Sequence, residues 1–380
     1  MYKISIKNMI FNKSARFYLH LKNYFSFILF ILVKPFISSK NIRINNKTIL
    51  FFNNGQIGDL LVSSIILENE DLLPKSFKYV FLIKEEYLSL FKNYKGLFEI
   101  KTYNLSEYRF NIKYKLNLIN ELNNLGIAKF FNLCAARGIL TEEFSYFIKS
   151  DEKIALNKSS FYLDSKLLNY FNNCYNNLLF DKQINEYEKT IGLLNLLDSN
   201  ISKNGTVLNK GKLFDFEIKA KDYIVIAPFT SDMSRNWGTI NYNKLIDLLS
   251  LKYNVVLLGS KNDIGKLDIV HNFRIKNLIG KTTLIEAAKY IAESKVYIGN
   301  DSGLTHIALK FNKPIIAIIG GGMWGRFFPF GNNNLHSFLA YKLNCFGCEW
   351  VCDFKVKYCI NLLSIEDIQN KVDTIYSKLL

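Results

Sequence analysis

The chain has 380 residues, which favours two domains, because a single hydrophobic core rarely grows beyond about 250–300 residues. Hydrophobic residues make up 49% of the chain and charged residues 22%, and this balance excludes an intrinsically disordered protein. The formal net charge of +16 favours a negatively charged partner, such as nucleic acid, anionic lipid or a phosphorylated glycan.

Over half of the excess charge lies in an N-terminal arm. Residues 1–47 contain nine Lys or Arg side chains and no Asp or Glu. The arm also holds an apolar block, Tyr24–Val33, which is shorter than the roughly 20 residues that a spanning helix needs. A basic, aromatic-rich helix of this kind is typical of a segment lying in a membrane interface. A cleaved signal peptide, which the poor cleavage site KPFISSK disfavours, and a helix packed on its own protein are the alternatives.

After the arm, strand-like runs alternate with helix-like segments. In the first half, the pattern predicts strands at 47–54, 79–84 and 129–134, a glycine turn, and an apolar helix over 58–70. Residues 155–200 indicate helix with little strand character. The polar, glycine-containing stretch 202–212 is the best linker candidate.

The alternation restarts after this linker. It predicts strands at 222–229, 253–260, 296–300 and 313–321, and helices at 241–252, 282–295 and 303–311. Such β-α units form parallel sheets covered by helices on both faces. We therefore expect an α/β protein with two Rossmann-like domains facing a central cleft, whose ligands bind at the carboxyl ends of the strands. The expected boundaries are an arm at 1–45, domains at 46–205 and 213–344, and a Cys-rich segment with a C-terminal helix at 345–380.

The first polar strand end is the sequence FFNNGQIGDLL. Gly55 and Gly58 permit a tight turn, and Asp59 opens the following helix. An Asp at this position can cap backbone N–H groups and favour the positive end of the helix. It can equally serve as a carboxylate that takes a proton from an alcohol. Both interpretations stay open from the residues alone.

Two further strand ends carry groups that suit phosphate. Hydroxyls and a guanidinium follow the strand in IAPFTSDMSRNW, where they can bind phosphate oxygens: Thr230, Ser231, Ser234 and Arg235. Asp301 follows the next such strand, Ser302 and Gly303 begin a helix, and His306 lies within it. A helix N-terminus with glycine is a ready anion site. Singly, each residue could be a cap, a buried histidine or a surface charge, but their joint occurrence predicts a diphosphate site.

These residues resemble glycosyltransferase family 9, the ADP-heptose:lipopolysaccharide heptosyltransferases. The C-terminal signature Asp-Ser/Thr-Gly-x-x-His-x-Ala is met in full by DSGLTHIA, residues 301–308, and GQIGD and TSDMSRNWG match its two other motifs. The resemblance covers roughly residues 47–330. It implies a GT-B fold that binds the donor mainly in the second domain and the acceptor in the first. It also implies inverting transfer without a metal or cofactor, and the chain contains no Asp-x-Asp.

The resemblance also implies individual roles. Asp59 would be the general base, while Thr230, Ser231, Arg235 and the helix start at Ser302 and Gly303 would hold the diphosphate. Asp301 and His306 would orient that loop or touch the sugar, Thr282 would lie near the adenine, and Asp263 near the ribose. Arg235 replaces the family's usual Lys, and Gly238 replaces a Pro, so the donor is less certain than the reaction.

Four of the six cysteines fall within fifteen residues, spaced C-x2-C-x3-C-x6-C: Cys345, Cys348, Cys352 and Cys359. This is no disulfide framework for the whole protein. Free or disulfide-paired thiols are the leading interpretation, and a structural zinc site is the alternative. The cluster follows the nucleotide domain, so we expect no catalytic role for it.

The leading hypothesis is transfer of heptose from ADP-heptose to a lipopolysaccharide or lipooligosaccharide core, at the inner face of the cytoplasmic membrane. The expected partners are the nucleotide sugar, an anionic lipid-linked glycan and the membrane surface, without nucleic acid, since no nucleic-acid-binding motif appears. The alternatives are a transferase of the same fold with another nucleotide sugar and another surface glycan, and a non-catalytic, membrane-associated glycan-binding protein.

Overall fold

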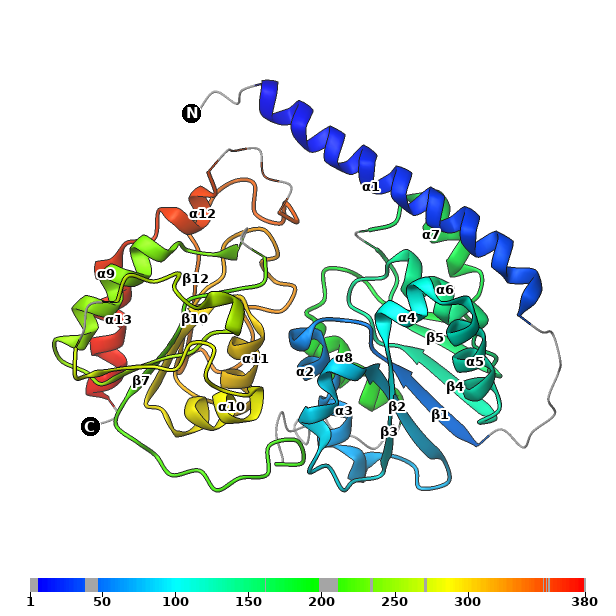
Figure 1. Cartoon of the computed structure of the whole chain (residues 1–380), viewed down its shortest axis with the longest axis horizontal. Helices are drawn as coiled ribbons and strands as arrows, with labels where there is room; N and C mark the ends of the chain where they lie inside the picture. Colours follow the sequence, from blue (N-terminus) through cyan, green and yellow to red (C-terminus); the bar gives the residue numbers. More distant parts are fainter. Residues whose placement is uncertain are drawn as a thin grey trace. The chain divides into compact units, whose positions relative to one another are not determined.

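The computed structural model describes residues 6–37, 47–160, 162–197, 211–232, 235–269, 272–350, 352, 354 and 356–378. The chain divides into two compact units (Figure 1). The N-terminal unit comprises Met9–Leu213, and the C-terminal unit comprises Phe214–Leu380 together with the start of the chain, Met1–Asn8.

The N-terminal unit is built on a six-stranded parallel sheet. Its strand order is β3 (Phe98–Tyr103), β2 (Lys78–Lys84), β1 (Thr48–Phe52), β4 (Ile127–Asn132), β5 (Glu152–Asn157) and β6 (Asn177–Phe180). The helices are α2 (Ile57–Ser63), α3 (Ile65–Glu68), α4 (Leu105–Phe110), α5 (Ile112–Asn123), α6 (Ile139–Phe147), α7 (Ser165–Asn172) and α8 (Glu186–Leu197). Every residue of β1 is buried, because helices cover both faces of a parallel sheet.

The long helix α1 (Ile6–Val33) packs on this unit through one side. Phe30 is 1% exposed and lies against Phe147 and Phe171, with ring centroids 5.3 and 5.4 Å away. The Asn23 side chain donates a hydrogen bond of 2.6 Å to the Tyr162 carbonyl oxygen. For this side of α1, the alternative interpretation of the arm as a helix packed on its own protein is therefore correct. Among the described residues, no helix is long and apolar enough to cross a membrane.

The C-terminal unit repeats the same design. Its strand order is β12 (His336–Leu339), β11 (Ile315–Ile318), β10 (Val296–Asn300), β7 (Ile224–Ala227), β8 (Val255–Leu257) and β9 (Ile275–Asn277), all parallel. The helices are α9 (Thr239–Ser250), α10 (Leu284–Glu293), α11 (Gly303–Lys310), α12 (Tyr358–Asn361) and α13 (Ile365–Ser377). Buried apolar residues of β7, β8, β10, β11, α9 and α13 share one core cluster.

Both sheets have the order 3-2-1-4-5-6 when their strands are numbered from the first of each unit. This is the Rossmann order. The succession of strands along the sheet reverses between the first and the fourth strand, and ligands bind at the carboxyl ends of the strands at that point. The predicted fold class, two Rossmann-like α/β domains of the GT-B type, is confirmed.

The predictions in 155–200 were partly wrong. Helices α7 and α8 do form there, but the chain also contributes strands β5, which begins before residue 155, and β6. The sequence analysis also missed the strands β3, β9 and β12. Strands β3, β6, β9 and β12 are the edge strands of the two sheets, and β5 lies beside the edge strand β6. Strands β3, β6 and β9 bury few residues, so they lack the continuous apolar run by which a buried strand is recognised.

The structure divides the chain between Leu213 and Phe214. Most of the expected linker, residues 202–210, lies outside the described residues, as does part of the N-terminal arm. The Cys-rich segment and α13 belong to the C-terminal unit, because Ile368, Val372 and Tyr376 of α13 complete its core cluster.

Candidate functional site

The C-terminal unit reverses its strand order between β7 and β10, and a buried asparagine joins the two strand ends. Asn300 ends β10 and is 0% exposed. Its side-chain amide donates to the Pro228 carbonyl oxygen at 2.6 Å, and its Oδ1 accepts the Trp237 N–H at 3.3 Å. Asn300 therefore holds the loop after β7 at the carboxyl end of β10. The sequence analysis read this residue only as part of a strand.

The turn between β10 and α11 leaves an open helix N-terminus. The Thr305 hydroxyl donates to the Asn300 carbonyl oxygen at 2.5 Å, which fixes the turn. Ser302 is the N-cap residue, but its side chain makes no capping bond. Its Oγ is buried and has no hydrogen-bond partner among the described residues. Because the first N–H groups of a helix have no partner inside it, this N-terminus can receive an anion with Ser302 Oγ and the backbone at Gly303.

Arg235 lies beside this turn, as the diphosphate prediction requires. Its Nη1 is 3.5 Å from Asp301 Oδ2, and its Nε is 3.9 Å from Asp232 Oδ2. Both separations are long for charge-assisted hydrogen bonds, so the guanidinium keeps donors for another oxygen. The Arg235 side chain is 25% exposed, whereas that of Asp301 is 6% exposed. The structure thus brings Arg235 and Asp301 together, and the more deeply buried Asp301 carboxylate helps to position the Arg235 guanidinium.

His306 is buried in α11 and is 3% exposed. Its ring lies 5.3 Å from the ring of Phe327 and 4.7 Å from that of Phe328. Burial, aided by the nearby positive charge of Arg235, lowers the pKa of His306 to about 3. The imidazole is therefore neutral at physiological pH, so it contributes no charge to an anion site.

The remaining predicted phosphate ligands lie in the loop after β7. Thr230 is half-buried, and its Oγ1 accepts the Asp232 N–H at 3.2 Å. Ser231 is exposed. Ser234 lies outside the described residues.

The two predicted nucleoside ligands follow the next strands of the same edge. Asp263 ends a short 3-10 helix (Lys261–Asp263) after β8. Its carboxylate accepts the Ser260 N–H and hydroxyl at 2.9 and 2.6 Å, and lies 2.8 Å from Lys266 Nζ. Burial alone would raise the pKa of Asp263, but bonds from Lys266 and Ser260 lower it. Asp263 thus has a local structural role. Thr282 is half-buried in the loop after β9.

In the N-terminal unit, Asp59 lies in the first turn of α2, after β1. Its Oδ2 accepts the Gln56 N–H at 2.8 Å, so the expected capping role is present. Oδ1 accepts no hydrogen bond among the described residues, and the side chain is half-buried. Burial, Glu86 and Asp59 itself raise the pKa of the neighbouring Tyr87 phenol. Asp59 therefore combines a fixed orientation with one available oxygen.

Gly55 is needed for a close approach. A Cβ at Gly55 would lie 2.3 Å from Asp59 Cβ and 2.7 Å from its Oδ2, so any side chain would displace the carboxylate. The sequence analysis placed Gly58 in the turn, but in the structure Gly58 is the second residue of α2.

A buried polar network that the sequence analysis missed lies at the ends of β4 and β5. Arg137 and Glu142 are both 0% exposed and make two bonds, of 2.9 and 2.7 Å. Arg137 also donates to the Asn157 carbonyl oxygen at 3.0 Å. Neutralised pairs of this kind hold loops in place, since an unpaired buried charge is costly. The two adjacent glutamates in α6, which lie among residues such as Ile139, Leu140 and Phe144, were the available signal.

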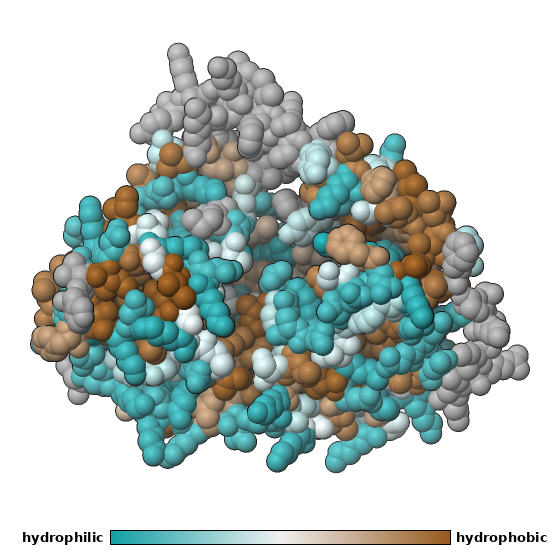
Figure 2. All heavy atoms as spheres, viewed as in Figure 1, coloured by the Kyte–Doolittle hydropathy of each residue, from teal (hydrophilic) through white to brown (hydrophobic). Residues whose placement is uncertain are grey.

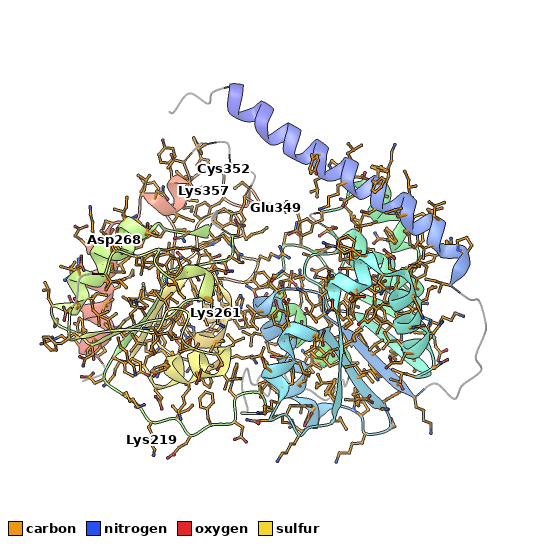
Figure 3. All side chains as sticks on the ribbon, viewed as in Figure 1. Lys219, Lys261, Asp268, Glu349, Cys352 and Lys357 are labelled. Atoms are coloured by element: carbon orange, nitrogen blue, oxygen red, sulfur yellow. The ribbon has the colours of Figure 1, made fainter. Side chains whose placement is uncertain are left out.

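The Cys-rich segment covers the loop after β11. A Cβ at Gly322 would lie 2.4 Å from the Trp350 ring, and one at Gly321 would lie 2.4 Å from the Phe346 ring. Burial raises the pKa of the Cys348 thiol and of the Cys359 thiol. Within the described part of the chain, no group of three His, Cys, Asp or Glu side chains could hold a metal. Glu349, Cys352 and Lys357 lie at one end of the unit, away from Lys219 (Figure 3).

Comparisons with known proteins relate part of the chain to one family. The model of glycosyltransferase family 9 (heptosyltransferase) matches residues 186–351, which include Arg235, Asp301 and His306 but not Asp59. This matched stretch of the chain belongs to glycosyltransferase family 9. The chain is 34% identical over 95 residues to lipopolysaccharide heptosyltransferase 2 of Escherichia coli, covering 23% of the chain and 27% of the relative. It therefore spans about a quarter of that relative's length.

A longer match is to lipooligosaccharide heptosyltransferase 2 of Campylobacter jejuni, 23% identical over 305 residues, covering 78% of this chain and 86% of the relative. Two solved structures share the fold. The family 9 glycosyltransferase of Veillonella parvula aligns with a TM-score of 0.67 and 15% identity, over 89% of this chain and 100% of the other. Escherichia coli heptosyltransferase WaaC with ADP-2-deoxy-2-fluoro heptose aligns with a TM-score of 0.61 and 15% identity, over 86% and 99%.

Proposed function

We propose that this chain is a family 9 glycosyltransferase that moves heptose from ADP-heptose to a lipopolysaccharide or lipooligosaccharide core, with inversion at the anomeric carbon. The observation that carries the proposal is the open N-terminus of α11, with the buried Ser302 hydroxyl and the Arg235 guanidinium beside it. Two of the relatives are heptosyltransferases of lipopolysaccharide and of lipooligosaccharide, and the WaaC structure contains ADP-2-deoxy-2-fluoro heptose.

The order of groups along the sheet edge supports a nucleotide sugar. Asp301 and Ser302 follow β10, Thr230 follows β7, Asp263 follows β8 and Thr282 follows β9, and these four strands are consecutive neighbours. Neighbouring strands lie about 4.8 Å apart, so the four strand ends span about 14 Å. We propose that the diphosphate binds at β10 and β7, the ribose near β8 and the adenine near β9. Because Asp263 is engaged locally, we expect its ribose contact to be the weaker part of this assignment.

Departure of the nucleoside diphosphate needs stabilisation of the negative charge that develops on its phosphates. We propose that Arg235 and the N–H groups at the start of α11 provide it, without a metal ion. Neutral His306 would support this loop by packing, and Asp301 would hold the guanidinium.

Formation of the new bond needs a base. We propose that Asp59 takes the proton from the acceptor hydroxyl as its oxygen attacks the anomeric carbon. The bond from that carbon to the phosphate oxygen breaks, and its electron pair leaves with ADP. The bond from the Gln56 N–H to Oδ2 orients the carboxylate, and Oδ1 is the oxygen that would accept the proton.

The acceptor would be anionic and lipid-linked, which fits the net charge of +16. We propose that the chain works as a peripheral protein at the cytoplasmic face of the inner membrane, without a nucleic-acid partner.

Calorimetric titration of ADP into the wild-type protein and into Arg235→Ala tests the proposal. Loss of a charge-assisted bond of about 1.5–3 kcal/mol should weaken ADP binding by roughly 10- to 100-fold. Arg274→Ala is the matched control in the same unit, because this guanidinium donates to the Leu251 carbonyl oxygen and lies over the Phe273 ring, neither of which belongs to the proposed site. Equal ADP affinity in wild type and Arg235→Ala would contradict the diphosphate assignment.

A further inference from the structure

One side of α1 presents a continuous apolar surface. Its exposed members are Tyr18, Leu21, Phe25, Ile28, Leu29 and Leu32, whose exposed fractions are 70, 59, 64, 56, 48 and 61%. Their spacing of three or four residues places them along one face of a helix. We call this the outer face of α1. Figure 2 shows hydrophobic residues gathered over the C-terminal part of this helix.

The opposite side of α1 fixes which residues face outward. Asn23 is 5% exposed and Phe30 is 1% exposed, and Phe27 packs edge-on against Tyr170 at 5.0 Å. Turning the helix to hide Phe25 or Leu32 would expose Phe30 and break the bond from Asn23. The outer face is therefore a feature of the folded unit.

Such a surface is unusual for a protein that meets only water. Single exposed apolar residues are common, but a contiguous row of six on one helix marks a binding surface. Tyr18 and Tyr24 add phenol groups, which are enriched where a hydrocarbon layer meets water.

The positive charge of the N-terminal arm favours a negatively charged partner. Helix α1 contains no Asp or Glu, and the first 47 residues of the chain carry nine basic side chains. Lys22 is exposed on the helix, and Lys34 is exposed just after it. Lys34 Nζ lies 3.5 Å from the Tyr170 hydroxyl, and the Asp164 carboxylate lies 3.8 Å from His20 Nδ1 beside the helix. The arm is nonetheless strongly basic in sequence, and an apolar helix face in a basic arm matches the interface of an anionic lipid leaflet, which offers both hydrocarbon and negative headgroups.

We propose that the outer face of α1 docks on an anionic phospholipid leaflet, with the helix lying along the membrane surface. This names the element by which the chain would reach a membrane, and it rests on α1 alone, so it stands or falls separately from the proposed sugar transfer.

The test uses the full-length protein and sedimentation with vesicles of phosphatidylcholine, alone or mixed equally with phosphatidylglycerol. We expect at least tenfold tighter binding to the mixed vesicles, weakened as sodium chloride rises from 0.1 to 0.5 M, because salt screens surface charge. The double variant Phe25→Asp, Leu32→Asp should bind them at least tenfold more weakly than wild type. The control Phe110→Asp, Phe273→Asp removes two aromatic side chains that are 79 and 93% exposed elsewhere, and should bind like wild type.

Three results would overturn the proposal. Wild type could fail to bind either vesicle, or the double variant could bind as tightly as wild type. Alternatively, wild type could sediment as a dimer without vesicles while the double variant is a monomer, which would assign the outer face to a second copy of the chain. Unfolding curves check that the variants are folded, and transfer to a lipid-free acceptor fragment separates this test from that of the proposed function. Deleting the arm is a poorer test, because it removes buried Phe30.

Discussion

Asp59 shows how one side chain can serve both structure and chemistry. Its Oδ2 accepts the Gln56 N–H, which satisfies one N–H at the start of α2. Gly55 leaves room for the carboxylate, since a Cβ there would lie 2.3 Å from Asp59 Cβ. A general base must keep one orientation toward the hydroxyl that it deprotonates, and this local bond would provide that orientation if Asp59 has the proposed role.

We expect Asp59→Asn to lower kcat by roughly 100- to 10,000-fold, because an amide cannot take the proton. ADP affinity should stay within about twofold of wild type, since the proposed diphosphate ligands are in the C-terminal unit. Steady-state transfer assays and calorimetry measure the two quantities.

The control for this variant is Asp367→Asn, which changes the corresponding third position of α13 and lies outside the proposed site. It should leave kcat unchanged. Normal turnover by Asp59→Asn would exclude Asp59 as the base.

At the scale of elements, the loop after β11 depends on the Cys-rich segment. Gly320 has φ +70°, a conformation that favours glycine, and a Cβ there would lie 2.6 Å from Ile360 Cγ1 and 2.8 Å from Trp350 Cη2. The next two glycines are covered by the rings of Phe346 and Trp350. The aromatic residues between the cysteines therefore close the carboxyl edge of the sheet beside β10.

We expect Gly320→Ala to lower the free energy of unfolding by about 1–3 kcal/mol, through backbone strain and the crowding of Ile360. Chemical denaturation measures it. Gly138→Ala is the control, because Gly138 has φ −112° and a Cβ there would meet no atom within 4 Å. If both variants are equally stable, the segment does not pack tightly on Gly320.

At the scale of the whole molecule, the two units use one design for different chemistry. Both have the Rossmann strand order, and both place polar residues where the order reverses. The C-terminal unit has a guanidinium and an open helix N-terminus at that point, which suit an anion. At the corresponding point, the N-terminal unit has the carboxylate of Asp59 and a buried Arg137–Glu142 pair without net charge, and neither of these suits an anion. A negatively charged donor should therefore be bound by the C-terminal unit.

We expect ADP to raise the unfolding temperature selectively in a panel of ADP, UDP, GDP and CMP, because a ligand at 100 times its Kd stabilises the native state by about 2.7 kcal/mol. At the same ADP concentration the stabilisation should fall to about 0.4–1.4 kcal/mol in Arg235→Ala, whose ADP binding is expected to be 10- to 100-fold weaker, and it should persist in Asp59→Asn. A larger shift with UDP, GDP or CMP than with ADP would move the donor to another nucleotide sugar while leaving the fold and the reaction class intact.

The sequence by itself determined the alternation of strands and helices, the two-unit plan and the strand ends that carry polar groups. These follow from local periodicity and from short motifs such as DSGLTHIA, so neighbours in the chain contain the information. The sequence analysis did not predict the short or partly exposed strands β3, β6, β9 and β12. A strand is recognised in sequence by the continuous apolar run that burial requires, and these strands lack such a run.

Only the tertiary structure decided which polar groups meet. Arg235 and Asp301 are 66 positions apart, and they approach because β7 and β10 are neighbours in the sheet. The same holds for Asn300 with Pro228, and for the side of α1 that packs through Phe30 while its outer face stays exposed. Strand order and helix rotation are set by packing between distant segments, and no local pattern encodes them.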